Sequence, residues 1–167
     1  NNGRRVINNE LRLDGGRYVM DLDDLEKKAA AHRARMLILC SPHNPVGRLW
    51  TRGELEELGR VCADHGLLVV SDEIHSDLVL GGRRHVPFAS VSDALAARSV
   101  VCTAPSKTFN LAGLQTANLI IPDAKLRAEY IAAQEECGFF SANAFGAVAL
   151  EAAYAHGEEW LDALIGY

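Results

Sequence analysis

The chain has 167 residues, of which 49% are hydrophobic and 23% are charged. This composition is typical of one globular domain with a sizeable core, and it argues against a disordered or fibrous chain. The 17 basic and 22 acidic side chains give a net charge of -5, which argues against a nucleic-acid-binding surface, since such surfaces need clustered Lys and Arg. The apolar runs at 36–40 and 67–70 are too short to span a bilayer, so we expect no membrane segment.

The four cysteines are scattered, and no pair has C-x-x-C spacing. Cys40, Cys62 and Cys102 sit in apolar stretches, where a free thiol behaves as a small buried hydrophobe. We therefore expect reduced thiols in a cytoplasmic protein rather than disulfides or a zinc site. The sequence begins without methionine and stops directly after a helical pattern. We interpret it as a piece of a longer protein, with residues 1–167 forming part of one large domain.

The sequence predicts a strand at 4–13, a turn at 14–16 and a short strand at 17–20. Asp21 is placed to cap a helix that ends near residue 32. The run 34–40 is continuously apolar, which is typical of a strand buried on both faces. It leads into a loop at 41–47 that two prolines and a glycine keep irregular.

Thr51 and Glu54 match the capping-box pattern of a helix that ends near residue 65, with Gly66 as its C-cap. The other expected elements are strands at 67–71, 99–102 and 117–121 and helices at 91–97, 123–137 and 142–155. Strands that alternate with helices predict an α/β fold, with a mainly parallel sheet sandwiched by helices.

Polar residues follow three of the expected strands, in the runs 41–44, 71–75 and 103–107. In parallel sheets, ligands bind beyond the carboxyl ends of the strands. We therefore expect Asn44, Asp72 and Lys107 to converge at one end of the sheet. Taken singly each signal is weak, because an aspartate after a strand often caps a helix and a loop lysine is usually solvated.

Several common site motifs are absent from the sequence. It contains no G-x-G-x-x-G and no G-x-x-x-x-G-K-[ST], so neither a dinucleotide fingerprint nor a P-loop is supported. It also lacks H-E-x-x-H, Cys/His spacing for zinc, and the G-x-S-x-G of α/β-hydrolases. We predict no metal site.

Three motifs, in this order, resemble the fold-type I pyridoxal-phosphate enzymes: PHNPVG at 42–47, SDEIH at 71–75 and SKTFNLAG at 106–113. Within that superfamily the chain is most similar to the cystathionine β-lyase (C–S lyase) branch of the class I/II aminotransferase family, over nearly its whole length. The resemblance implies part of an aspartate-aminotransferase-like large domain and a pyridoxal 5′-phosphate cofactor. It also implies a small amino-acid substrate and a homodimer.

The resemblance also implies roles for the residues that match the family's motifs. Lys107 corresponds to the lysine that forms a Schiff base with the cofactor aldehyde, and Asp72 to the aspartate paired with the pyridine nitrogen. Asn44 corresponds to the asparagine that hydrogen-bonds the 3′ oxygen of the ring. Ser106 lies where a hydroxyl commonly binds the cofactor phosphate, and Thr103 is a second such position.

Two positions depart from the aminotransferase pattern, and both departures fit the C–S lyase branch. His75 stands where many aminotransferases have a tyrosine near the 3′ oxygen, so it either contacts the cofactor or packs behind it. Gln115 stands where they often have a phosphate-binding arginine. Other polar groups are interpreted as structural or solvated, namely His43, Glu73, Asp77 and His85.

These residue types suit the implied chemistry. Pyridoxal phosphate acts as an electron sink, and the protein orients it. An unprotonated lysine attacks the aldehyde and, once a substrate amine has displaced it, serves as a general base at Cα. A carboxylate beside the pyridine nitrogen keeps that nitrogen protonated, which stabilises the carbanion at Cα.

Three functions remain open at this point. The first is a C–S β-lyase that converts an amino acid by α,β-elimination into pyruvate, ammonia and a thiol. The second is an aminotransferase that uses the same residues. The third is an inactive truncated fragment or a noncatalytic binding domain, because the family's upstream phosphate-binding turn, its ring-stacking aromatic residue and its substrate-binding arginine have no counterpart in these 167 residues.

Overall fold

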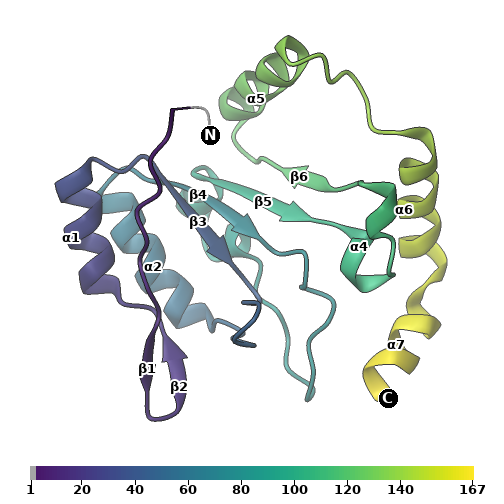
Figure 1. Cartoon of the computed structure of the whole chain (residues 1–167), viewed down its shortest axis with the longest axis horizontal. Helices are drawn as coiled ribbons and strands as arrows, with labels where there is room; N and C mark the ends of the chain where they lie inside the picture. The colour runs from purple at the N-terminus through teal and green to yellow at the C-terminus, as the bar shows by residue number, and fades with distance from the viewer. Residues whose placement is uncertain (1–2) are drawn as a thin grey trace.

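The computed structural model describes residues 3–167 and has a four-stranded sheet at its centre (Figure 1). The strand order is β3-β4-β5-β6. The strands are β3 at Met36–Cys40, β4 at Leu68–Asp72, β5 at Ser99–Thr103 and β6 at Asn118–Ile120. The first three are mutually parallel, whereas β6 runs antiparallel to β5. The predicted α/β class with a mainly parallel sheet is confirmed.

Seven α-helices, two short 3-10 helices at Phe88–Ser90 and Ala112–Leu114, and a hairpin accompany the sheet within residues 3–167. The helices are α1 at Leu22–His32, α2 at Arg52–Asp64, α3 at Asp93–Ala96, α4 at Pro105–Thr108, α5 at Ala124–Glu136, α6 at Ala144–His156 and α7 at Glu158–Gly166. The hairpin joins β1 at Arg12–Asp14 to β2 at Arg17–Val19. In Figure 1, α1 and α2 lie on the β3 side of the sheet, and α6 and α7 lie on the far side beyond α4.

The helix starts expected from the sequence are confirmed by their caps. Asp21 Oδ1 accepts the N–H of Asp24 at 3.0 Å at the start of α1. At the start of α2, Thr51 and Glu54 form the full capping box. Asp123 caps α5 by accepting the N–H of Leu126 at 2.7 Å. Each cap satisfies a helix N–H that has no partner within the helix.

The hydrophobic core lies between α1, α2 and one face of the sheet. Leu39 and Val69 contribute from β3 and β4, Leu25 from α1 and Leu55 from α2. Trp50 closes the cluster and is 2% exposed. Because successive residues of a strand point to opposite faces, only alternate residues of β3 reach this core.

Two of the strand predictions are wrong in part. The strand expected to be buried on both faces exposes Met36 by 52% and Ile38 by 73%, because only Leu37 and Leu39 face the core. The strand expected over 4–13 is regular only at its end, since the residues before Arg12 have no partner strand within the described chain. The short helix α4 was not expected. No helix within residues 3–167 combines the length and the apolar character that crossing a bilayer requires.

Candidate cofactor site

The ends of β4 and β5 bring two predicted site residues to the same edge of the sheet. Asp72 is the last residue of β4 and pairs with Cys102 of β5. Lys107 follows shortly after β5, on α4. Asp72 is half-buried, and its Oδ1 accepts the N–H of Ile74 at 3.3 Å, whereas Lys107 is exposed. A carboxylate and a primary amine therefore lie beyond the carboxyl ends of neighbouring parallel strands.

Asn44 and His75 line one hollow of about 200 Å³, with Pro42, His43 and Leu78 among its other walls. The Nδ1 atom of His75 is buried and has no hydrogen-bond partner within residues 3–167. The same is true of His43 Nδ1, and burial lowers the pKa of the His43 ring. Buried polar atoms are nearly always paired in proteins, so these two nitrogens favour a polar ligand in the hollow.

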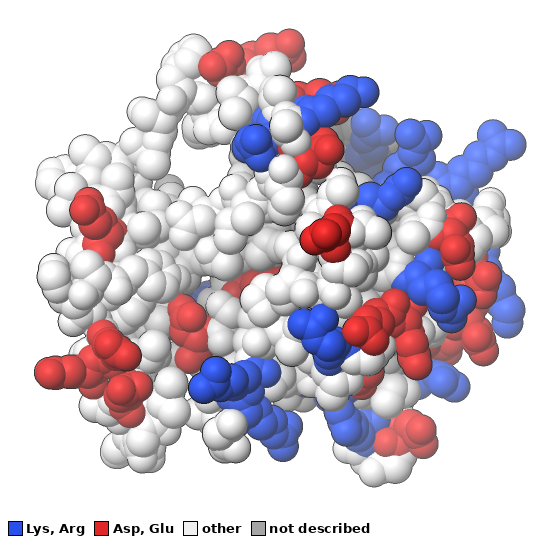
Figure 2. All heavy atoms as spheres, turned by 180° about the vertical axis from the view of Figure 1, so that it is seen from behind, with Lys and Arg blue, Asp and Glu red and all other residues white. Residues whose placement is uncertain are grey.

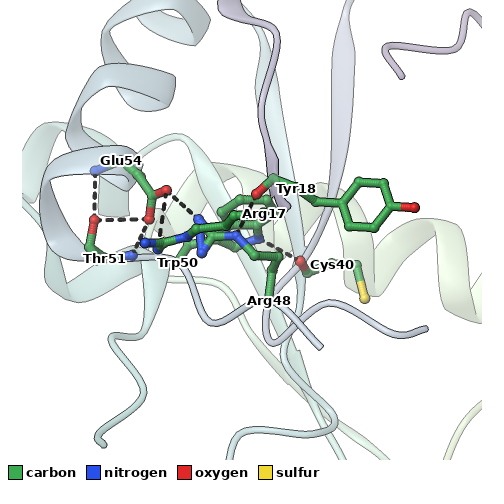
Figure 3. A network of polar contacts seen from close by, with 7 residues as sticks. All are labelled: Arg17, Tyr18, Cys40, Arg48, Trp50, Thr51 and Glu54. Carbon is green, nitrogen blue, oxygen red and sulfur yellow. Dashed lines mark hydrogen bonds and ion pairs between the residues drawn. The ribbon is translucent and has the colours of Figure 1, made fainter. Parts of the chain in front are cut away.

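A buried network holds the loop that carries Asn44, as Figure 3 shows. Arg48 is 7% exposed; its Nε donates to the carbonyl of Tyr18 at 2.6 Å, and its Nη2 pairs with Glu54. Trp50 Nε1 donates to the carbonyl of Cys40 at 2.9 Å. These contacts tie the loop to β2, to β3 and to the start of α2, so the backbone around Asn44 is fixed on both sides.

The two predicted phosphate-binding hydroxyls lie in different places. Ser106 is half-buried and precedes Lys107 on α4. Thr103 follows Cys102, so its side chain points to the face of the sheet opposite Asp72. Its hydroxyl oxygen accepts from Asn118 Nδ2 at 3.3 Å, and it lines a separate hollow of about 550 Å³. The structure therefore separates Thr103 from the hollow beside Asn44.

Glu73 and His85 form a buried pair beneath β4, as the structural interpretation of these residues expects. Glu73 is 1% exposed. Its Oε1 accepts from the hydroxyl of Ser71 at 2.8 Å and from the N–H of Phe88 at 2.9 Å. The Nε2 atom of His85 lies 2.6 Å from Oε2 of Glu73. This pair fixes the segment 85–88 under the strand and leaves Asp72 on the opposite face.

The residues that support the loop around Asn44 were not predictable from the sequence. Arg48 and Trp50 carry no local pattern that sets them apart from solvated loop residues. Asp77 fits its interpretation as a structural group, because its Oδ2 accepts the hydroxyl of Thr108 at 2.8 Å; the partner was not predicted. A partial signal for Arg48 was present in the capping box, because Glu54 also binds Arg48.

A mainly parallel sheet, with an aspartate at the end of β4 and a lysine just beyond β5, is the arrangement that the resemblance to pyridoxal-phosphate enzymes implies. The family model described as aminotransferase class I and II matches residues 9–164. The chain belongs to this family.

Individual relatives confirm the expected kinship with the C–S lyase branch. The chain is 52% identical over 166 residues to cystathionine beta-lyase PatB of Bacillus subtilis, covering 99% of this chain and 43% of that protein. It is 37% identical to protein MalY of Escherichia coli, covering 98% of this chain and 41% of the relative. The chain thus spans about two-fifths of the length of these relatives.

Two solved structures share the fold. Cystalysin of Treponema denticola, which contains a pyridoxal 5′-phosphate cofactor, superposes with a TM-score of 0.93 at 36% identity, covering 98% of this chain and 41% of that one. The pyridoxal-phosphate-bound C–S lyase of Staphylococcus hominis gives a TM-score of 0.84 at 35% identity, covering 94% of this chain and 39% of that one.

Proposed function

We propose that this chain is the cofactor-binding part of a pyridoxal-phosphate-dependent C–S β-lyase that cleaves amino acids such as cystathionine into pyruvate, ammonia and a thiol. The observation that carries the proposal is the placement of Asp72 and Lys107 at one edge of the sheet, on the paired strand β4 and on the helix that follows β5. In this proposal residues 1–167 form part of the large domain of a longer enzyme.

The side chains at this edge fit the functional groups of pyridoxal phosphate. Its aldehyde needs an amine, its ring nitrogen a carboxylate and its 3′ oxygen a hydrogen-bond donor, and Lys107, Asp72 and Asn44 supply them. The unpartnered Nδ1 of His75 lies at the same hollow as Asn44. That hollow of about 200 Å³ is smaller than the ~300 Å³ from which ligand pockets usually start, so these residues would cover only part of the cofactor.

We assign each side chain one role in the proposed site. Lys107 Nζ binds the cofactor and then moves the proton at the substrate Cα. Asp72 holds the ring nitrogen protonated, and Asn44 fixes the tilt of the ring through its amide. Ser106 donates to the phosphate, and His75 borders the ring beside Asn44. When bound, the cofactor supplies an electron sink for the electron pair left at Cα.

The proposed role of Thr103 in phosphate binding needs a test of its own. Its hydroxyl lies on the other face of the sheet, beside Glu73 and His85. A role in phosphate binding requires the cofactor to reach past the end of β5, and Thr103→Val tests that role by the cofactor's dissociation constant. An unchanged constant removes Thr103 from the set.

Among the curated relatives, the lyase is favoured over an aminotransferase by how far each sequence likeness extends along this chain. Cystathionine beta-lyase PatB aligns with 99% of this chain. Aspartate aminotransferase of Bacillus subtilis is 35% identical over 62% of it. The last residue of the SDEIH motif supports the same choice, because His75 stands where the aminotransferase pattern has a tyrosine.

The test uses the full-length holoenzyme with cystathionine and without any 2-oxo acid. Release of pyruvate and free thiol is expected, and turnover that requires an added 2-oxo acid would instead identify an aminotransferase. Borohydride reduction followed by peptide mass spectrometry is expected to place the cofactor on Lys107. Lys107→Ala abolishes the adduct, and Lys125→Ala, at a side chain that is 87% exposed on α5, serves as the matched control. An adduct elsewhere, or none, overturns the proposal.

A comparison of the isolated 167-residue chain with the full-length enzyme tests the third function, a truncated or noncatalytic form. The 167-residue chain alone is expected to bind the cofactor weakly and to turn over little substrate, because its hollow covers only part of such a ligand. Cofactor affinity in the isolated chain equal to that of the full-length enzyme would contradict this expectation.

We further propose a homodimer in the cytoplasm. Three phenylalanines around the start of α6 are exposed by 65% to 81%, namely Phe139, Phe140 and Phe145. Charged side chains are sparse over α6 in Figure 2, and clustered exposed apolar groups are typical of interaction sites. The four free cysteines suit a reducing compartment. Sedimentation of the full-length enzyme tests the dimer.

A further inference from the structure

One buried hydrogen bond joins the two segments that carry Asp72 and Lys107. The hydroxyl of Thr108 donates to Oδ2 of Asp77 at 2.8 Å. Thr108 is fully buried, with 0% of its surface exposed, and it directly follows Lys107 on α4. Asp77 lies in the turn that follows Asp72 at the end of β4. The bond therefore spans the distance between the two strand ends.

Contacts from α6 and α7 complete the support of α4 on the same side. Phe109 packs edge-on against Tyr154, with ring centroids 5.3 Å apart, and lies 5.9 Å from Trp160. The Tyr154 hydroxyl lies 3.4 Å from Oδ2 of Asp77. Burial and the charge of Asp77 raise the pKa of Tyr154, so this hydroxyl stays protonated and donates to the carboxylate.

These contacts decide which way α4 faces. The helix is a single turn, so its own backbone hydrogen bonds fix its direction weakly. Thr108 at the end of the helix is held by Asp77, and Phe109, the residue that caps the helix, packs on Tyr154, whereas the neighbouring Lys107 is exposed. A hydrogen bond from a hydroxyl to a carboxylate is short and directional. The bond from Thr108 therefore restricts rotation of the helix about its axis.

We propose that Asp77 and Thr108 are positioning residues that aim Lys107 Nζ at the carbonyl carbon of the cofactor. This inference rests on the proposed function, in which Lys107 binds pyridoxal phosphate. Attack of an amine on a carbonyl requires the two atoms to meet at about 3–3.5 Å in the correct direction, and a misplacement of about 1 Å costs on the order of 100-fold in rate. Neither Asp77 nor Thr108 touches the reacting atoms in this role.

Variants of Thr108 separate the effect of the hydrogen bond from the effect of side-chain volume. Thr108→Val keeps the volume and loses the donor, whereas Thr108→Ser keeps the donor. In the full-length protein, freshly loaded with pyridoxal phosphate, we expect Thr108→Val to slow covalent attachment to Lys107 by about 10- to 100-fold. Thr108→Ser is expected to stay within about threefold of the wild type. Attachment is followed by borohydride trapping and peptide mass spectrometry.

A second arm excludes a merely structural role. In a Lys107→Ala background the cofactor binds without a covalent bond, so its dissociation constant reports the rest of the site. If Thr108 only supports the fold, Thr108→Val also weakens this binding. If it aims Lys107, the dissociation constant stays within about twofold. Asp77→Ala combined with Thr108→Val is expected to slow attachment little more than Thr108→Val alone, because the Thr108 bond is already absent and the only further loss is the Tyr154 contact at 3.4 Å.

The outcomes for the two proposals are distinct. If wild-type Lys107 is never modified, the proposed function fails. If it is modified and Thr108→Val attaches the cofactor at the wild-type rate, only the positioning inference is overturned. If Thr108→Val does not fold, Asp77→Ala, which removes the acceptor, decides the matter by the same rate: slower attachment with unchanged noncovalent affinity supports the inference, and an unchanged rate overturns it.

Discussion

The guanidinium carbon of Arg48 lies 4.4 Å from the centre of the Trp50 ring. Arg48 also donates to the backbone of Tyr18 and pairs with Glu54, so one side chain joins the hairpin, the Asn44 loop and helix α2 (Figure 3). Arginine suits this place, because its planar group stacks on an aromatic ring and still donates at its edges. The position of Asn44 therefore depends on a cation that is not itself among the residues that line the hollow.

Replacing this arginine is expected to destabilise the fold. Arg48→Met keeps an apolar stem but leaves Glu54 and the Tyr18 carbonyl without their donor, which should lower the free energy of unfolding by about 2–3 kcal/mol. Arg60→Met is the matched control on α2, because its pair with Asp64 is 70% and 60% exposed and should contribute less than about 0.5 kcal/mol. Urea denaturation measures both, and equal losses would contradict the role assigned to Arg48.

The same network predicts a loss of stability in acid. Burial acts to raise the pKa of Glu54, but hydrogen bonds from Thr51 and Arg48 outweigh it and hold the pKa below its usual 4.5. The unfolded chain therefore binds this proton more tightly than the folded one. The carboxylate stabilises the fold above about pH 4.5, and this contribution disappears as the pH falls through the lower folded pKa.

Glu54→Gln tests this dependence by urea midpoints at about pH 7 and about pH 3.5. The difference in stability between wild type and variant should be largest at neutral pH and should shrink in acid. Glu57→Gln, at an exposed position of the same helix, should show no such convergence. A constant difference across the two pH values would refute the assignment.

Two glycines of α2 are expected to respond in opposite ways to alanine. A Cβ at Gly59 would overlap the Leu95 side chain, with Cδ2 only 2.8 Å away, whereas a Cβ at Gly53 meets nothing within 4 Å. Gly59→Ala should therefore cost about 1–3 kcal/mol through overpacking. Gly53→Ala should stabilise by about 0.5 kcal/mol, because alanine loses less backbone freedom in a helix. Thermal melting of the two variants gives the comparison, and a rise in melting temperature for both would show that helix propensity outweighs the overlap with Leu95.

Local patterns predicted the helix starts, because a cap depends on residues within one turn of each other. Asp21 and the Thr51–Glu54 capping box were identified from such spacing, and both accept the expected N–H. The order of polar residues after strands predicted that Asn44, Asp72 and Lys107 share one edge, since parallel strands share their carboxyl end; the structure puts Asp72 at the end of β4 and Lys107 just after β5.

Contacts between distant segments were beyond those patterns. Arg48 binds the carbonyl of Tyr18, 30 residues away, and Thr108 binds Asp77, 31 residues away. Neither residue differs by type or spacing from an ordinary loop or helix residue. The burial of β3 was overestimated for a related reason, because an apolar run such as 36–40 shows that a strand needs cover but not which elements supply it.

The cysteines should differ widely in reactivity toward an alkylating reagent. Burial raises the pKa of the Cys62 thiol to about 12, so its thiolate fraction near neutral pH is on the order of 10⁻⁵. Burial and the charges of Asp72 and Glu73 also raise the pKa of Cys102. Cys137 is exposed after α5 and should be labelled first. Mass spectrometry of native protein after brief iodoacetamide treatment checks the order, and early labelling of Cys62 would contradict its burial.

The buried pair of Glu73 and His85 gives a final test of how the strand that carries Asp72 is supported. The carboxylate receives the Ser71 hydroxyl, the Phe88 N–H and the His85 ring. His85→Ala removes one of these partners inside a site that is 1% exposed at Glu73, and an unpaired buried acceptor costs about 1–3 kcal/mol. His156→Ala, at an exposed position near the end of α6, is the control and should change stability by less than about 0.5 kcal/mol.

A double variant shows whether the pair acts as one unit. Glu73→Gln removes the charge but keeps an oxygen for Ser71 and Phe88, so His85→Ala should cost less in that background than in the wild type. Urea denaturation of the two single variants and the double variant yields the interaction energy, which should be about 0.5–3 kcal/mol for groups in contact. Strictly additive losses would mean that His85 stabilises the segment by packing alone, and that the carboxylate beside Asp72 is held by Ser71 and Phe88 without it.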